Sequence, residues 1–244
     1  MARTPRGKRP SIVVGTDASA SARHAVTRAT QLAARDGATL HIVHARGRIP
    51  AGLRRLFGVG PSPADAVLDE VVEHARAAGA NAQLHRLEAG AIEALRAVAG
   101  RVAADLVVVG TRGRAVPHLV LGSTAERVAS GLRVPVLLVR NSGHRRYRET
   151  FIAAGLDTAL GPAVRAARLV APDVPVSVVH AYQGQFEVTL LMHGVNARNL
   201  AAYRAQARKE ARTTMLARLA AAGLERSALV LRHGDPRNVL PLLP

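Results

Sequence analysis

One stretch of this chain has the residue types and spacing of a phosphate-binding loop. Gly110-Thr111-Arg112-Gly113-Arg114 follows a buried apolar run, and Gly122-Ser123-Thr124 opens the next helical stretch. Glycine lets the backbone approach an anion closely, and a helix N-terminus offers free N–H groups. Arginine adds fork-shaped donors. The pattern predicts a phosphate cradle formed by Gly110, Arg112, Gly113, Arg114, Gly122, Ser123 and Thr124.

A second candidate element lies near the N-terminus. The β-like run Ser11–Val14 ends in Gly15-Thr16-Asp17. In an open parallel sheet, ligands bind beyond the carboxyl ends of the strands, where the strand order reverses. The residues after the first and fourth strands are therefore expected to meet, so Gly15, Thr16 and Asp17 join the predicted site.

The elements that must position these residues alternate along the first 140 residues. Strands are predicted at Ser11–Val14, Thr39–Ala45, Asn81–Glu88, Asp105–Val109 and Pro135–Val139. Helices are predicted at Ser19–Asp36, Ala64–Ala78, Ala91–Ala103 and Ser123–Ser130. Such alternation is typical of βαβ units. The fold class predicted is α/β, with a five-stranded parallel sheet and helices on both faces, as in Rossmann-like proteins.

The rest of the chain begins again in the same way. Phe151–Ala181 echoes Ser11–Ala45, with Asp157 at the place of Asp17, and His180-Ala181 repeats His44-Ala45 after a contraction of four residues. A long helix (Ala197–Ala222) and a third strand (Ala228–His233) follow. Nothing corresponds to Asp105–Arg140. Internal repetition thus predicts a basic tail (1–10), a first domain (11–140), a linker (141–149) and an incomplete second copy (150–244).

These motifs resemble the universal stress protein family. The resemblance rests on Gly110-x2-Gly113 and Gly122-Ser123 after the run DLVVV, on VGTDAS near the N-terminus, and on Val43-His44-Ala45. It implies a five-stranded α/β domain, usually dimeric, of which a subset binds ATP or AMP through G-x2-G-x9-G-[ST]. By the same resemblance, Gly110, Gly113, Gly122 and Ser123 would bind phosphates and ribose. Asp17 and the backbone at Ala45 would hold the nucleoside, with or without Mg2+.

One departure and several simpler interpretations stand beside this hypothesis. Eight residues separate Gly113 from Gly122, where the family motif has nine. Ser123-x-x-Glu126 is also a capping box, Asp17 is a possible helix cap, and Gly110 and Gly113 are possible turn residues. His41 and His44 are expected on opposite faces of a strand, so no metal site is predicted. Asp157 has no glycine loop after it, so no nucleotide is expected in the second copy.

Composition limits the alternatives. The 244 residues contain no cysteine, which excludes disulfides, thiolate metal sites and a cysteine nucleophile. No apolar run approaches the roughly 18 residues of a membrane span, and we identify no signal peptide, so no membrane association and a cytoplasmic location are expected. Walker, dinucleotide-binding, G-x-S-x-G and H-E-x-x-H motifs are missing. We expect binding without dedicated catalysis, with slow ATP hydrolysis at most.

Three functions follow from these observations. The first is a tandem stress protein that binds adenine nucleotide in its first domain and regulates or dimerises through its second. The second is a nucleotide-free interaction module, motivated by the shortened loop, whose homodimer forms through the apolar edge strand Val134–Val139. The third is a basic nucleic-acid-associated protein, suggested by the net charge of +17 but opposed by only 2% aromatic residues.

Overall fold

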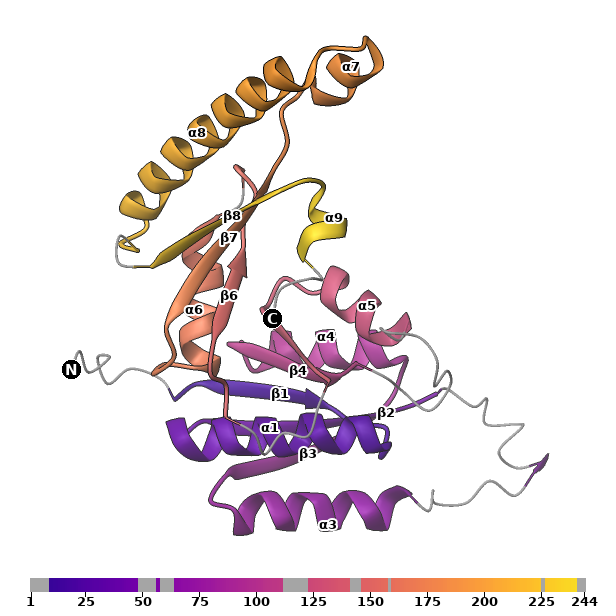
Figure 1. Cartoon of the computed structure of the whole chain (residues 1–244). Helices are drawn as coiled ribbons and strands as arrows, with labels where there is room; N and C mark the ends of the chain where they lie inside the picture. The colour runs from indigo at the N-terminus through magenta and orange to yellow at the C-terminus, as the bar shows by residue number, and fades with distance from the viewer. Residues whose placement is uncertain are drawn as a thin grey trace. The chain divides into compact units, whose positions relative to one another are not determined.

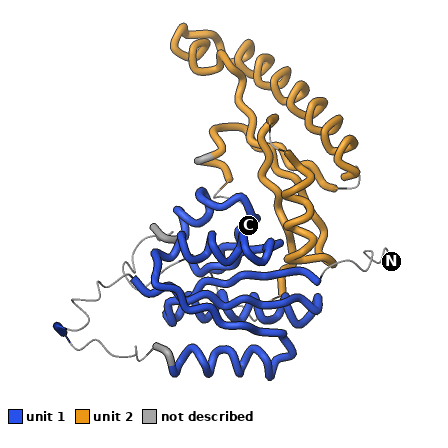
Figure 2. The backbone as a smooth tube through the Cα atoms, turned by 180° about the vertical axis from the view of Figure 1, so that it is seen from behind, with its two compact units in different colours: residues 1–145 blue, residues 146–244 orange. Residues whose placement is uncertain are grey.

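The chain forms two compact units, residues 1–145 and 146–244, in a computed structural model (Figure 2). The structure describes residues 9–47, 56–57, 64–111, 123–140, 146–157, 159–224 and 227–240. In these ranges no helix is both long and apolar enough to cross a membrane. Each unit is built on a parallel sheet of its own.

The first unit confirms the predicted five-stranded sheet. Its strands are β1 (Ser11–Gly15), β2 (Thr39–Arg46), β3 (Asn81–Glu88), β4 (Leu106–Gly110) and β5 (Val136–Val139). They pair in the order β3-β2-β1-β4-β5, all parallel. β1 and β4 are buried apart from their last residues, which explains their nearly continuous apolar sequences. The strand order reverses between β1 and β4.

Four helices of the first unit cover this sheet, and Figure 1 shows them on its two sides. They are α1 (Ala20–Asp36), α3 (Ala64–Ala77), α4 (Ala91–Arg101) and α5 (Ser123–Gly131). One core of the unit lies between the sheet and α4. It joins Val13, Val43 and Val107, each from a different strand, to Leu95 and Val98 of α4. The predicted boundaries are correct within one or two residues.

The second unit has a sheet of three parallel strands. β6 (Thr150–Ala153), β7 (Val176–Tyr182) and β8 (Ala228–His233) pair in that order. The helices are α6 (Leu160–Val170), α7 (Glu187–Met192), α8 (Ala197–Ala221) and α9 (Pro236–Val239). α7 was not predicted. The core of the unit joins Ile152 and Val178 of the sheet to Val164 of α6 and to Met215 and Leu219 of α8.

The strand register corrects the predicted equivalence of the two aspartates. β1 pairs with β2 at an offset of 28 residues, as in Gly15↔Val43, whereas β6 pairs with β7 at an offset of 26, as in Ala153↔Val179. If the two copies paired alike, the contraction of four residues would give β6 and β7 an offset of 24 residues. The pairing is thus displaced by two residues, which keeps each side chain on its face. Asp157 lies two residues before the helix cap, as Asp17 does, but two residues farther from the strand pairing.

Candidate functional site

A cavity of about 150 Å³ opens in the first unit at the carboxyl ends of β1, β2 and β4. Since a single water needs roughly 10–15 Å³, the cavity has room for a larger group. Its lining combines the predicted Gly15, Thr16, Asp17, Ala45 and Gly110 with Ala22, Val43, Ala91, Leu95, Val109 and Ala125. Because Asp17 is the one ionisable residue among the described lining residues, the cavity is a largely apolar slot with one carboxylate.

The loop between β1 and α1 is fixed by local hydrogen bonds. Asp17 Oδ1 accepts from the Ser19 N–H at 2.9 Å, and Thr16 Oγ1 accepts from the Ala18 N–H at 3.2 Å. Ala18 has a φ of +61°, in the left-handed region. Ser19 is the N-cap of α1, its side chain accepting from the Ala22 N–H. The interpretation of Asp17 as the helix cap is therefore wrong, because Asp17 supports the turn before the cap.

Thr16 is also tied to β2 through both of its peptide groups. Its N–H donates to the Val43 carbonyl at 2.9 Å. Its carbonyl lies 2.9 Å from Nδ1 of His44, a histidine that is 8% exposed. The carbonyl can only accept, so Nδ1 of His44 carries the hydrogen in this bond. The first loop of the cavity is thus attached to the neighbouring strand at two points.

Packing alone requires a glycine at position 110, whether or not a ligand binds. A Cβ at this position would lie 2.5 Å from Ser21 Oγ, 2.7 Å from the Ser21 carbonyl oxygen and 2.8 Å from its carbonyl carbon. The close approach of β4 to the first turn of α1 therefore requires glycine here. At Gly15 a Cβ would meet Val109 and Leu95 at 3.3 and 3.4 Å, which is tight but involves side chains only.

The remaining predicted residues lie in or next to the glycine loop. Arg112, Gly113, Arg114 and Gly122 are outside the described residues. Ser123 and Thr124 form the start of α5, and the structure describes their backbone only. Ala125, in the same first turn, lines the cavity. The N-terminus of α5 therefore lies at the cavity.

Sequence reasoning missed the apolar wall of this cavity. The sequence marks Val43 only as part of a motif, and it predicts helix or strand for Ala91, Leu95 and Val109 without a role at the site. The alternation of β2 could have indicated that Val43 faces the same side as Ala45. No comparable signal marks Ala91 and Leu95, because their place depends on how α4 crosses the sheet.

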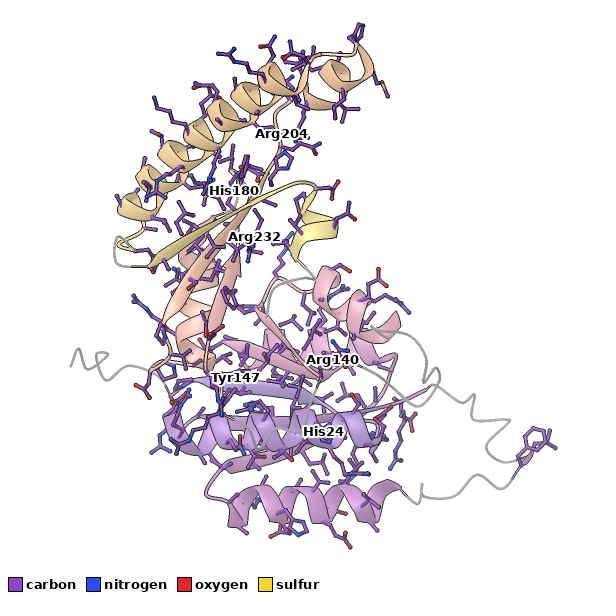
Figure 3. All side chains as sticks on the ribbon, viewed as in Figure 1. His24, Arg140, Tyr147, His180, Arg204 and Arg232 are labelled. Atoms are coloured by element: carbon purple, nitrogen blue, oxygen red, sulfur yellow. The ribbon has the colours of Figure 1, made fainter. Side chains whose placement is uncertain are left out.

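The carboxyl ends of β7 and β8 in the second unit carry a charged cluster. The side chain of Glu187, 2% exposed, accepts from Arg204 Nε at 2.6 Å and lies 2.8 Å from His233 Nε2. Burial alone would raise the pKa of Glu187, but the hydrogen bonds from His233 and Arg204 lower it below its usual value. Tyr182 meets the His233 ring edge-on, with ring centroids 5.5 Å apart. Arg204 and the strand residue His180 are labelled in Figure 3.

A histidine pair lies on β2 and β3 of the first unit. His41 Nδ1 is 3.0 Å from His85 Nε2, and Arg101 Nη2 donates to His85 Nδ1 at 3.0 Å. Burial, followed by the charge of Arg101, lowers the pKa of His85; burial, His85 and Arg101 lower that of His41. Among the described residues, no group of three His, Cys, Asp or Glu side chains could hold a metal ion.

The fold and the cavity together define the class of protein. An open parallel sheet with a slot at its switch point is a Rossmann-like arrangement, in which ligands bind beyond the carboxyl ends of the strands. The family model of the universal stress proteins matches residues 8–140. The chain belongs to the universal stress protein family.

Solved structures give further comparisons. A candidate universal stress protein from Pseudomonas aeruginosa UCBPP-PA14 matches 96% of this chain and 77% of its own, with a TM-score of 0.61 and 15% identity, which shows a shared fold. A universal stress protein in complex with cAMP is 35% identical (54% of this chain, 96% of that chain, TM-score 0.43). One from Archaeoglobus fulgidus in complex with dAMP is 25% identical (55% and 98%, TM-score 0.41). A search of curated proteins found no match.

Proposed function

We propose that the first unit binds an adenine nucleotide, ATP or AMP, in the cavity at the switch point of its sheet. The observation that carries the proposal is the composition of that cavity. Val43, Ala45, Leu95 and Val109 form an apolar slot that fits the faces of a base, and Asp17 offers a carboxylate to ribose hydroxyls. The cyclic and deoxy adenine nucleotides bound in the two similar proteins indicate which ligand class to test.

The phosphates would extend toward the start of α5. Ala125 places the first turn of this nine-residue helix at the cavity, and the free N–H groups of a helix N-terminus stabilise anions. Gly110, Arg112, Gly113, Arg114, Gly122, Ser123 and Thr124 remain the predicted phosphate contacts, with Gly15 and Thr16 beside them. The described cavity offers one carboxylate and no metal cage, so Mg2+ would arrive bound to the phosphates. We propose a regulatory role in the stress response, without dedicated catalysis.

A pair of alanine substitutions tests this proposal. Ala91 is the exposed first residue of α4 and lines the cavity, so Ala91→Phe should fill the slot. The matched control is Ala197→Phe at the exposed first residue of α8. Calorimetric titration with MgATP should show binding in the wild type and the control, and at least about tenfold weaker binding in Ala91→Phe, since an obstructed slot loses most of its contacts. Equal affinities in all three proteins would contradict this site.

A homodimer through β5 is a second proposed property. In the described part of the chain β5 pairs with β4 alone, and Val136, Leu137 and Leu138 are only partly buried. An open apolar edge can pair with another copy. Val136→Lys should convert a dimer into a monomer in size-exclusion chromatography with light scattering. Ser130→Lys, which changes an exposed residue of α5, should not. A dimer that survives Val136→Lys would refute this interface.

A further inference from the structure

His44 is placed to act on the cavity without touching a ligand. Val43 and Ala45 line the cavity, and successive side chains of a strand point to opposite faces of the sheet. The buried His44 side chain therefore lies on the other face, where its Nδ1 contacts the Thr16 carbonyl. The hydrogen bond to the Thr16 carbonyl links the His44 side chain to the loop that lines the cavity.

Thr16 in turn determines where Asp17 lies. Its carbonyl belongs to the peptide group that leads into Asp17, so holding that oxygen fixes the orientation of the peptide plane. The bonds that follow, from the Ala18 N–H to Thr16 Oγ1 and from the Ser19 N–H to Asp17 Oδ1, span only two residues each. They shape the turn but do not attach it to the sheet. His44 and the Val43 carbonyl provide that attachment.

We infer that His44 is a positioning residue of the nucleotide site, whose Nδ1–H fixes the Thr16 carbonyl and thereby the Asp17 carboxylate at the cavity. This inference rests on the proposed function. The charge of the imidazole is not required, because Nδ1 carries a hydrogen both in this neutral tautomer and in the protonated ring. What matters is a donor at the position of Nδ1.

The second unit contains the same attachment without the carboxylate beside it. His180 Nδ1 lies 2.8 Å from the Ala154 carbonyl, and the Ala154 N–H donates to the Val179 carbonyl at 2.9 Å. His180 is 5% exposed. Asp157, however, lies three residues beyond Ala154, whereas Asp17 directly follows Thr16. His180 is therefore a matched control for the structural part of the effect.

Two amide substitutions separate the donor from the rest of the side chain. The amide nitrogen of asparagine occupies a place near that of Nδ1, while the amide nitrogen of glutamine lies one bond farther out, nearer to Nε2. His44→Asn should keep the bond to Thr16, and His44→Gln and His44→Leu should lose it. Calorimetric titration of the full chain with MgATP should give about tenfold weaker binding for Gln and Leu. The affinity of His44→Asn should stay within about threefold of the wild-type affinity. His180→Gln and His180→Leu should bind MgATP as tightly as the wild type does.

Hydrogen exchange supplies a readout that does not depend on nucleotide. In the protein without nucleotide, the Ser19 amide should exchange faster in His44→Gln than in the wild type or in His44→Asn. If the wild type binds MgATP and His44→Gln shows the same affinity and the same exchange rate, the inference is overturned and the proposed function stands. Equal weakening by the His180 variants would also overturn it, because the effect would then be general destabilisation. Wild-type protein that binds no MgATP would remove the proposed function and, with it, this role.

Discussion

The two units begin with the same strand, helix and strand, yet they differ where their strands end. In the first unit the carboxyl ends of β1, β2 and β4 surround a cavity with an apolar wall and one carboxylate. In the second unit the ends of β7 and β8 carry Glu187, Arg204 and His233 in direct contact, contributed partly by the segment that forms α7 and α8. The sheet fixes where a site can lie, and the connecting segments decide whether a ligand or the protein's own side chains occupy it.

The largest change in unfolding free energy should appear when a methyl group is added at Gly110, where β4 approaches the first turn of α1. Gly110→Ala would place Cβ within 2.8 Å of the Ser21 backbone, so unfolding free energy should fall by about 3 kcal/mol. The control is Gly161→Ala in α6, where a Cβ would meet only Arg165 Nη1 at 3.5 Å, and stability should change by roughly 1 kcal/mol or less. Urea denaturation measures both. Equal effects would show that the approach at Gly110 relaxes easily.

The next largest effect concerns the charged cluster of the second unit. Glu187→Gln should lower its unfolding free energy by about 2 kcal/mol, less than for a fully buried pair, because Arg204 and His233 are 42% and 35% exposed and can rehydrate. Glu210→Gln, at an exposed position of α8, is the control, with a change within about 0.5 kcal/mol. Native-state hydrogen exchange of β7 and β8 would report the loss. Similar values for both variants would remove the cluster as a source of stability.

Asp17 in the first unit and Asp157 in the second should differ in their effect on nucleotide affinity. Asp17→Asn keeps an oxygen for the Ser19 N–H but removes the carboxylate charge, so MgATP affinity should fall about tenfold. Asp157→Asn should leave affinity unchanged, because its aspartate is displaced by two residues from the strand pairing. Calorimetric titration of the two variants decides this. A matching loss in Asp157→Asn would indicate that the second unit also holds nucleotide.

The smallest effect distinguishes the units by pH. His41 and His85 have lowered pKa values in the folded chain, so the unfolded chain binds protons more readily, and the first unit should lose stability as the pH falls below about 6.5. Glu187 also has a lowered pKa, so its contribution is present above about 4.5 and is lost as the pH falls below that value. Hydrogen exchange measured in each unit between pH 7 and 4 should show the first unit weakening earlier. His85→Gln should reduce that early loss, and the exposed His74→Gln should not.

Much of the first unit could be predicted because its sequence repeats simple local signals. Apolar runs such as Leu106–Val109, a helix stop at Gly37 and β-branched residues in Thr39–Ala45 determine the element type locally. The positions of Gly15, Thr16, Asp17 and Gly110 followed from the rule for parallel sheets, and the structure brings these residues to one cavity.

The parts that could not be predicted depend on contacts distant in sequence. The buried cluster joins Glu187 to His233, 46 residues away, and no local pattern reveals such a pair. The two-residue displacement of β6 against β7 was hidden by the sequence echo, because a shift by two preserves the alternation of buried side chains. The packing role of Gly110 depends on Ser21 in another element, so the sequence alone left it as a turn or phosphate glycine.

We propose that the first unit holds one nucleotide and that the second unit holds none. The most direct test is a calorimetric titration of the nucleotide-free 244-residue chain with MgATP at physiological salt, repeated for Ala91→Phe. We expect saturable binding close to one nucleotide per chain in the wild type and strongly weakened binding in the variant. No binding, supported by a second method, or two nucleotides per chain would contradict it.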